Sequence, residues 1–291
     1  MILSAYQTHI FILIFIYIIL AVSLNLALGY TGLLNLGHVA FFGIGAYTSA
    51  LLAIEGFPYL ATMLAAGILA SVFGFLLVTA TDKLKGDYMA MATLGFSFVV
   101  YSLLLNLRDI TRGAMGIPGI PKPSILGLTI KSNDQYLIFA MMVCAISVFI
   151  MYRIVRSPFG KLLEANRDNA VSLRILGKNT FGLKYKAMMI SAFFAGISGS
   201  LYAHYITFID PTSFYISELI LILTIVIVGG LASIKGSIVA TVVIIYVPEI
   251  LRTLDLPSSV IGPARQALYA LILIAILMIR PRGIFGKVDL E

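Results

Sequence analysis

Long apolar runs separated by short polar connections dominate this chain. No Asp, Glu, Lys, Arg or His occurs from Ile10 to Leu28, from Met89 to Leu107, or from Leu219 to Ile234. A helix needs about 20 apolar residues to cross a hydrocarbon core of about 30 Å, and each run meets or approaches that length. The runs lack the alternation of transmembrane strands. The pattern therefore predicts an all-α, polytopic transmembrane helical bundle.

The apolar segments predict nine spans within a single domain, 1–291. Only two connections between them are long: 108–134 and 155–184. Several spans carry small residues four positions apart, such as Ala66, Ala70 and Gly74, which allow close helix packing in lipid. The predicted spans are 8–28, 34–54, 59–80, 88–107, 135–154, 185–207, 216–233, 236–252 and 264–280.

The charge content and its distribution agree with a membrane location. Hydrophobic residues make up 60% of the chain and charged residues 11%, whereas a soluble chain is about 25% charged. If 155–184 is cytoplasmic, that side holds 14 Lys and Arg residues and the other side 6, as the positive-inside rule requires. The N-terminus is then outside and the C-terminus inside. The net charge of +7 thus indicates membrane topology rather than nucleic-acid binding.

The cytoplasmic connection contains a predicted helix that is too polar to span a membrane. Ser157 and Pro158 are typical of a helix start, and Gly177 can end the helix after Lys161–Leu176. Apolar and charged residues are mixed along it. It is either a docking helix for a cytoplasmic partner or an interfacial helix on lipid headgroups.

A glycine-rich segment, Gly29–His38, places polar side chains in or near the bilayer. Asn25, Asn35 and His38 are predicted to face protein or a water-filled cavity. The segment either borders a permeation path or makes hydrogen bonds between helices beside a tight turn.

The outer connection, Arg108–Asp134, is rich in glycine and proline and shows no helical pattern. Loops of this length are often functional. It either receives a soluble partner or forms a lid without one.

Several classes of site are missing from the sequence. No P-loop motif occurs, since Gly160-Lys161, Gly177-Lys178 and Gly286-Lys287 lack the earlier glycine. The histidines are dispersed, Cys144 is the single cysteine, and Glu218 lies near a span end, where we interpret it as interfacial. We expect no catalytic residues, no metal site and no cofactor bound by this chain. The first apolar run is interpreted as a retained span, because it lacks the pattern of a signal peptide.

Ordered motifs along nearly the whole chain resemble those of LivM-type permeases of branched-chain amino acid ABC importers. They include Arg112-Gly113 with Gly116-Ile117-Pro118-Gly119, Ser157-Pro158-Phe159-Gly160-Lys161, Gly229-Gly230-Leu231-Ala232, Pro248-Glu249 and Arg280-Pro281-Arg282-Gly283. LivH-type, urea and amide permeases share several of these motifs, and the block from Arg112 to Pro121 favours LivM.

The resemblance implies a permease subunit in the plasma (inner) membrane. Its partners would be a second, LivH-type permease, two cytoplasmic ATPase subunits that hold ATP and Mg²⁺, and an extracytoplasmic binding protein. Branched-chain or related neutral amino acids are the implied substrates. A urea or short-amide permease, or a stand-alone secondary transporter or channel, are the alternatives.

The resemblance also implies roles for individual residues. Asn166 and Asn169 depart from the expected apolar pattern of the coupling helix, which leaves its docking face open. The implied coupling-helix residues are Gly160, Lys161, Glu164, Ala165, Arg167, Asp168, Leu173 and Gly177. We expect the translocation path near Asn25, Asn35, His38 and Tyr47, and binding-protein docking at Arg112, Gly113, Gly116, Pro118 and Lys122.

Overall fold

The computed structural model describes residues 5–84, 86–125, 128–130, 132–252, 258–280 and 282–286, and within these ranges it is a bundle of long helices. The long helices are α1 (Ala5–Asn25), α2 (His38–Ile54), α3 (Tyr59–Thr81), α4 (Asp87–Asn106), α6 (Asn133–Arg156), α8 (Thr180–Ile206), α9 (Ile216–Gly229), α10 (Ile234–Arg252) and α11 (Ser258–Ile279).

Shorter elements connect these helices. A π-helical turn, η1 (Leu26–Tyr30), extends α1, and α7 (Pro158–Ile175) lies between α6 and α8. The remaining short elements are α5 (Arg108–Thr111), η2 (Gly113–Met115), η3 (Pro211–Phe214), β1 (Ile117–Pro118), β2 (Ser124–Ile125), β3 (Leu128–Thr129) and β4 (Phe208–Ile209). Strand β1 pairs antiparallel with β4, and β2 pairs antiparallel with β3.

Seven described helical segments are long and apolar enough to cross a membrane. Two shorter apolar helices, His38–Ile54 and Ile234–Pro248, occupy two further predicted spans. These helices confirm the prediction of an all-α, polytopic membrane bundle. A transmembrane helix satisfies its own backbone hydrogen bonds, which is why this class of structure follows so directly from hydropathy.

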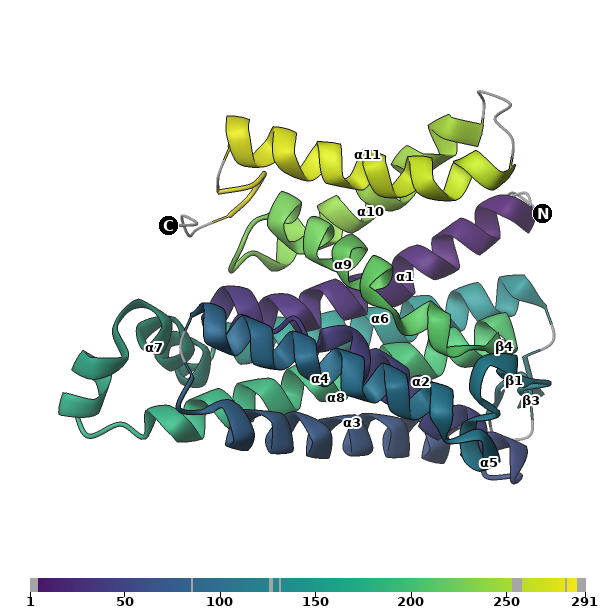
Figure 1. Ribbon diagram of the computed structural model, residues 1–291, viewed down its shortest axis with the longest axis horizontal. Helices are drawn as coiled ribbons and strands as arrows, with labels where there is room; N and C mark the ends of the chain where they lie inside the picture. Colours follow the sequence, from purple (N-terminus) through teal and green to yellow (C-terminus); the bar gives the residue numbers. More distant parts are fainter. Residues whose placement is uncertain are drawn as a thin grey trace.

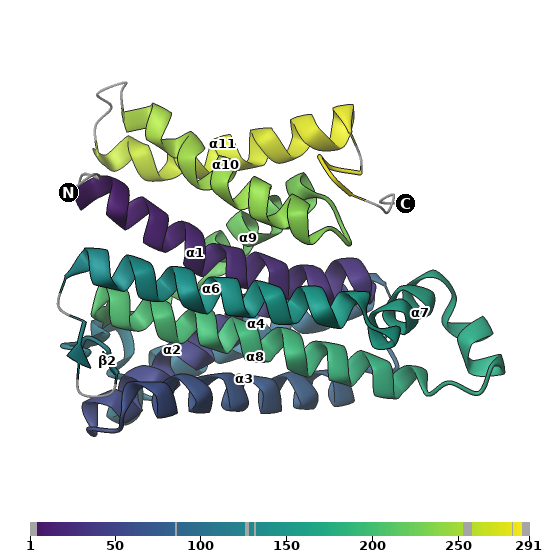
Figure 2. The same ribbon diagram turned by 180° about the vertical axis from the view of Figure 1, so that it is seen from behind.

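The bundle is elongated, and its two long connections lie at opposite ends (Figures 1 and 2). Helix α7 projects from one end, the α7 end, whereas α5 and the β1–β4 pair lie at the other, the β end. Consecutive long helices run in alternating directions between these ends. Helices α9, α10 and α11 form one side of the molecule, and α1 lies between them and the rest.

Helix α2 forms the centre of the bundle and is almost completely enclosed by α3, α4, α8 and α9. Small residues allow this close approach. A Cβ atom added to Gly45 of α2 would lie 2.3 Å from the Cα of Gly196 in α8, and one on Gly199 would lie 2.1 Å from the carbonyl oxygen of Phe42. Backbone contact of this kind provides van der Waals packing where the hydrophobic effect between helices is absent.

The predicted row of small residues on α3 is a packing seam. Ala66 and Ala70 are fully buried, and a Cβ on Gly74 would lie 2.8 Å from the Cβ of Ala192. The opposite face of α3 exposes large apolar residues, including Leu64 and Ile68. In a bilayer this exposed face contacts lipid, so the amphipathic pattern of a soluble helix is replaced by a small-versus-large pattern.

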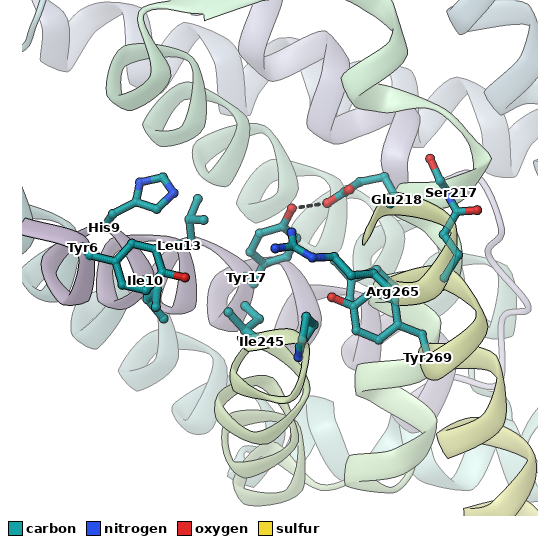
Figure 3. Close-up of a pocket in the computed structure, with 14 residues that line it drawn as sticks. Tyr6, His9, Ile10, Leu13, Tyr17, Ser217, Glu218, Ile245, Arg265 and Tyr269 are labelled. Atoms are coloured by element: carbon teal, nitrogen blue, oxygen red, sulfur yellow. Dashed lines mark hydrogen bonds between the residues drawn. The ribbon is translucent and has the colours of Figure 1, made fainter. Parts of the chain in front are cut away.

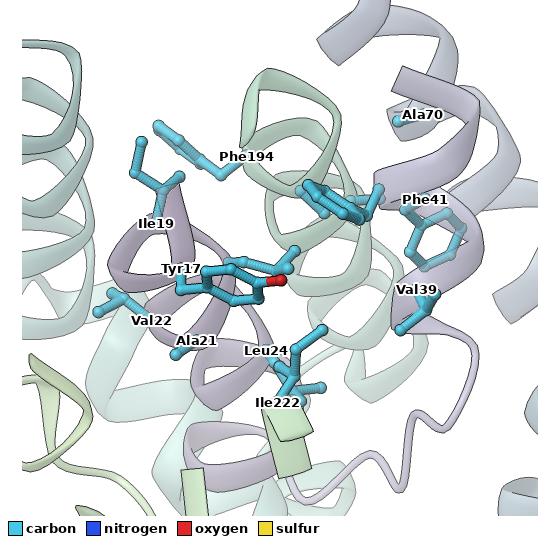
Figure 4. Close-up of a cluster of buried hydrophobic side chains, with 14 of the residues drawn as sticks. Tyr17, Ile19, Ala21, Val22, Leu24, Val39, Phe41, Ala70, Phe194 and Ile222 are labelled. Carbon is cyan, nitrogen blue, oxygen red and sulfur yellow. The ribbon is translucent and has the colours of Figure 1, made fainter. Parts of the chain in front are cut away.

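Large apolar side chains fill the spaces where glycine does not bring the backbones together. Residues from α1, α2, α3, α8 and α9, among them Tyr17, Leu24, Phe41, Phe194 and Ile222, form one buried cluster (Figure 4). This cluster joins α1 and α9 to the central helices.

The prediction for the second span was wrong at its start. The span was expected from residue 34, but α2 begins at His38, and residues 32–35 have no regular structure. Gly32 has a φ of +73°, a conformation that ends the preceding helix and that residues with a Cβ adopt poorly. Hydropathy does not report such a break, because Leu33, Leu34 and Leu36 remain apolar.

The close contact between α2 and α8 leads to a testable prediction. Gly45→Val should destabilise the protein by about 1–3 kcal/mol or more, because the added atoms meet backbone that cannot rotate away. Gly95→Val is the matched control: Gly95 lies in the middle of α4, and nothing lies within 4 Å of an added Cβ. Thermal unfolding of both variants in detergent, followed by size exclusion, should show a lowered Tm for Gly45→Val only. Equal losses in both variants would contradict the packing argument.

Candidate functional site

Helix α7, which carries the predicted coupling residues, is built as the sequence indicates at both ends. Ser157 caps its N-terminus by accepting a hydrogen bond from the Gly160 amide, and Pro158 occupies the first turn. Gly177 follows the last turn with a φ of +73°. The prediction of a helix between Ser157 and Gly177 is confirmed.

The middle of α7 differs from the prediction of one continuous helix. Asn169 has non-helical backbone angles, and its side-chain oxygen accepts a hydrogen bond of 2.9 Å from the Ser172 amide. Asn169 therefore ends one helical piece and caps the next, a role for which an asparagine side chain is well suited. The polar residue that departs from the family pattern thus breaks the helix into two.

The first piece of α7 is anchored to the bundle and the second projects from it (Figure 1). Leu163 is fully buried and Leu173 is buried, whereas Val171, Ile175 and Leu176 are 62%, 81% and 73% exposed. Gly160 is buried, and its missing Cβ allows contact with the Val155 carbonyl. The projecting piece therefore presents an apolar surface beyond the bundle. Of the other coupling residues, Lys161 and Ala165 are exposed and Glu164 is half-buried.

Arg167 connects α7 to the interior of the bundle. Its Nη1 donates a hydrogen bond of 2.8 Å to the carbonyl oxygen of Gly29, in the π-helical turn after α1. Asp168 accepts from Nε and pairs with Nη2, also at 2.8 Å, and so orients the guanidinium. A Cβ on Gly32 would lie 2.8 Å from the Arg167 side chain. The exposed helix and the buried turn are thus in direct contact.

Asn25 lies at the start of this turn and fastens it to the connection between α9 and α10. Its Nδ2 donates to the carbonyl oxygens of Gly230 and Ser233, both at 3.2 Å, and to Ser237 Oγ at 2.7 Å. Its Oδ1 accepts from the Ala232 amide at 3.0 Å. Both functional groups of this fully buried amide are satisfied, as burial in an apolar environment requires.

The connection between α9 and α10 also forms hydrogen bonds with residues from 282–286, which follow α11. The Ile284 and Phe285 amides donate to the carbonyl oxygens of Val228 and Gly229 at 2.9 and 3.1 Å. Gly230 has a φ of +100° and lies against Gly286. The motifs Gly229-Gly230-Leu231-Ala232 and Arg282-Gly283, 50 residues apart in the sequence, therefore form one structural unit at the α7 end.

The irregular segment before α2 runs back into the bundle and exchanges hydrogen bonds with α4. Thr93 Oγ1 donates to the Leu34 carbonyl and accepts from the Leu36 amide, and Ser97 Oγ donates to the Leu36 carbonyl. Non-helical backbone at membrane depth is tolerated where protein groups satisfy it. His38 then begins α2, with Nε2 2.9 Å from Ser23 Oγ.

The four predicted path residues are all buried: Asn25, Asn35, His38 and Tyr47. Asn35 contacts Met188 and the Gly37 amide, and Tyr47 packs on Phe214. None of the four lines any of the four main pockets among the described residues. A translocation path beside them stays a prediction.

The predicted docking loop is folded down onto the β end of the bundle. Arg112 and Gly113 both have positive φ, Gly116 contacts Phe208 and Ile209, and Pro118 pairs with Phe208 in the β1–β4 ladder. The Pro121 carbonyl oxygen lies 2.7 Å from Nδ1 of His204, a buried residue of α8. Sequence reasoning missed these small strands and the short helix α5. The loop nevertheless exposes Arg112, Pro118 and Lys122, and its role in docking stays a prediction.

Sequence reasoning missed a polar cavity that lies among the described helices. It has a volume of about 420 Å³ and lies between α1, α9, α10 and α11, near the β end (Figure 3). Glu218, which we interpreted as interfacial, lines it and accepts a hydrogen bond from Tyr17 of α1. Arg265 of α11 extends into the same space. Tyr17 lies in the middle of an apolar run, and this is the sequence signal for a polar site there, because a buried tyrosine hydroxyl needs a hydrogen-bond partner.

No metal-binding group was found in the part of the chain that the structure describes, where no three His, Cys, Asp or Glu side chains come together.

Comparison with known proteins supports the resemblance drawn from the motifs. The family model of the branched-chain amino acid transport system permease component matches residues 7–280. The high-affinity branched-chain amino acid transport permease LivM of Escherichia coli K12 is 37% identical over 262 residues, covering 81% of this chain and 61% of the relative. This chain thus spans 61% of the length of that relative. No solved structure matches this chain.

More distant relatives cover almost the full chain. A probable LivM of Methanocaldococcus jannaschii is 26% identical over 94% of this chain and 91% of its own length. The LivH permease of Salmonella typhimurium is 22% identical over 94% of this chain and 92% of its own. The family model and the identity to LivM confirm the assignment: this chain belongs to the family of permease components of branched-chain amino acid transport systems.

Proposed function

We propose that this chain is one membrane subunit of an ABC importer that carries branched-chain or related neutral amino acids into the cell. It would pair with a second, LivH-type permease, and two cytoplasmic ATPase subunits would hold ATP and Mg²⁺. An extracytoplasmic binding protein would deliver the substrate. Membership of the family supports this proposal, and the relatives named for branched-chain amino acid transport supply the substrate class.

The orientation proposed for the chain has nine spans in the plasma (inner) membrane, with the N-terminus outside and the C-terminus inside. Three features support it. The nine long helices alternate in direction, the two long connections lie at opposite ends, and basic residues concentrate at the α7 end, as the positive-inside rule expects for the cytoplasmic side.

The observation that carries the coupling proposal is the contact between Arg167 and Gly29. The second piece of α7 projects from the bundle with Val171, Ile175 and Leu176 exposed, which is the kind of surface that a partner protein covers. The first piece is tied through Arg167 to the turn that Asn25 fastens to the α9–α10 connection. A force applied to α7 would therefore reach α1, α2, α9 and α10 together.

The outer loop is proposed as the docking surface for the binding protein. Arg112, Gly113, Gly116, Pro118 and Lys122 lie on a segment that is held by the β1–β4 pair and by His204. A loop held in place loses less conformational entropy when a partner binds.

Charge reversal on α7 tests the proposed ATPase contact. Glu164→Lys combined with Asp168→Lys should lower uptake of L-leucine by the assembled transporter about tenfold or more, because it reverses the charge of the proposed ATPase-facing surface and removes the ion pair that orients Arg167. Asp87→Lys is the matched control, an exposed acidic residue on another helix. Membrane insertion of all variants should stay normal. If ATPase co-purification and uptake are both unchanged in the double variant, α7 is not the coupling element.

A second substitution tests Arg167 as a positioning residue. Arg167→Gln removes the bond to Gly29, so less leucine should be transported for each ATP hydrolysed, while ATPase subunits still co-purify. Arg167→Lys should lower the ratio of leucine transported to ATP hydrolysed less than Arg167→Gln does, because it keeps the positive charge. Arg174→Gln, at an exposed position of the same helix, should leave the ratio unchanged. Parallel changes in transport and hydrolysis would argue for a merely structural role.

A further inference from the structure

The cavity between α1, α9, α10 and α11 reaches deep into the bundle. Tyr6 and Tyr17 of α1 both line it, and these positions are roughly 16 Å apart at 1.5 Å per helical residue. Because α1 begins at the β end, the cavity extends from that end to about the middle of the proposed membrane. Its volume of about 420 Å³ is within the usual range of small-molecule sites, about 300–1,000 Å³.

Two opposite charges face this cavity without neutralising each other. Glu218 accepts a hydrogen bond from the Tyr17 hydroxyl, which holds one carboxylate oxygen in place. Arg265 comes from α11 and extends into the same cavity, and its Nε is buried with no hydrogen-bond partner in the described structure. No ion pair within 4.0 Å joins Glu218 to Arg265 among the described residues.

Charges that are withdrawn from water and left unpaired raise the free energy of the protein, because no partner charge offsets the desolvation of each ion. A ligand with both a cationic and an anionic group would offset the desolvation of both side chains at once. A purely cationic or anionic ligand would satisfy one side chain and leave the other unpaired. A neutral amide or nucleoside would need neither charge.

The cavity wall also includes apolar side chains from α1, α9 and α10, which lie among polar residues such as His9 and Ser217. The apolar side chains are those of Ile10, Leu13, Leu221 and Ile245. Apolar side chains beside two separated charges match a molecule whose charged groups lie at one end and whose aliphatic chain lies at the other.

From these features we infer that the cavity is a binding site for a zwitterionic α-amino acid with an aliphatic side chain. Glu218 would receive the ammonium group, Arg265 the carboxylate, and the apolar residues of the wall the aliphatic side chain. Tyr17 is a positioning residue that orients Glu218. The assignment rests on the proposed import function and deepens it, since it names the groups that would recognise the substrate within the permease.

Thiol protection tests the site without requiring transport. Cys144→Ala removes the single cysteine, and Ser217→Cys then places a thiol on the cavity wall of the assembled transporter, without the binding protein. L-leucine should slow labelling of this thiol by a membrane-impermeant reagent about tenfold, at about ten times the concentration that gives half-protection. Thr212→Cys, five positions earlier and exposed, is the matched control, and its labelling should not respond to leucine.

Analogues that lack one charge test the two proposed contacts separately. Glu218→Gln should raise the half-protecting concentration of L-leucine and of leucinol, which keeps only the amine, by about tenfold or more. It should leave 4-methylpentanoate, which keeps only the carboxylate, unaffected. Arg265→Gln should show the reverse pattern. An unchanged elution volume of each variant in size exclusion, with the ATPase subunits still co-purifying, verifies that the variant is folded.

Each outcome decides the assignment. Protection by leucine that depends on both charges, with the reciprocal analogue pattern, supports the site. Absence of leucine protection, or protection that survives both substitutions, overturns it. If the wild-type transporter with its binding protein takes up leucine in that case, the proposed function stands and only the site is wrong. If it takes up no branched-chain amino acid, the proposed function itself fails.

Discussion

Satisfaction of backbone hydrogen bonds in the absence of water is the constraint on which this structure depends. The nine long helices of the described chain meet it through their own backbone hydrogen bonds. The chain between α1 and α2 does not form a regular helix. Its peptide groups bond instead to Thr93 and Ser97 of α4. Each unsatisfied group at this depth would cost several kcal/mol, so the polar residues of α4 are as necessary to the fold as its apolar surface.

The break before α2 has a consequence for the proposed coupling. A continuous helix would present no free carbonyl at Gly29, whereas the π-helical turn presents one that Arg167 binds. Asn25, one turn earlier, holds the same region to the α9–α10 connection. The weak point of the helical pattern is therefore the place where an external helix contacts the interior. The broken helix α7 completes this arrangement, because Asn169 separates an anchored piece from a projecting one.

The two ends of the molecule use polar residues differently. At the α7 end, Asn25 is enclosed and all of its hydrogen-bonding capacity is used within the protein. Toward the β end, Glu218 and Arg265 face a cavity; Glu218 accepts a hydrogen bond from Tyr17, whereas the buried Nε of Arg265 has no partner among the described residues. Enclosed and satisfied polar groups stabilise one arrangement of helices, while polar groups at a cavity are available to a ligand. In the proposed function, residues of the first kind would transmit motion and residues of the second kind would recognise the substrate.

The sequence by itself determined the membrane class, the approximate positions of the helices, the small-residue seam of α3 and the limits of α7. These follow from local patterns: hydropathy, four-residue spacing and capping residues act within one or two helical turns. The resemblance in motifs determined the family. Only the tertiary structure decided that Asn25 bonds to residues more than 200 positions away, that Arg167 contacts Gly29, and that Glu218 and Arg265 share one cavity. Such contacts depend on which faces of distant helices meet. In lipid, close packing of small residues around α2 makes that choice, and a local pattern reports a small-residue face but not the helix that it meets.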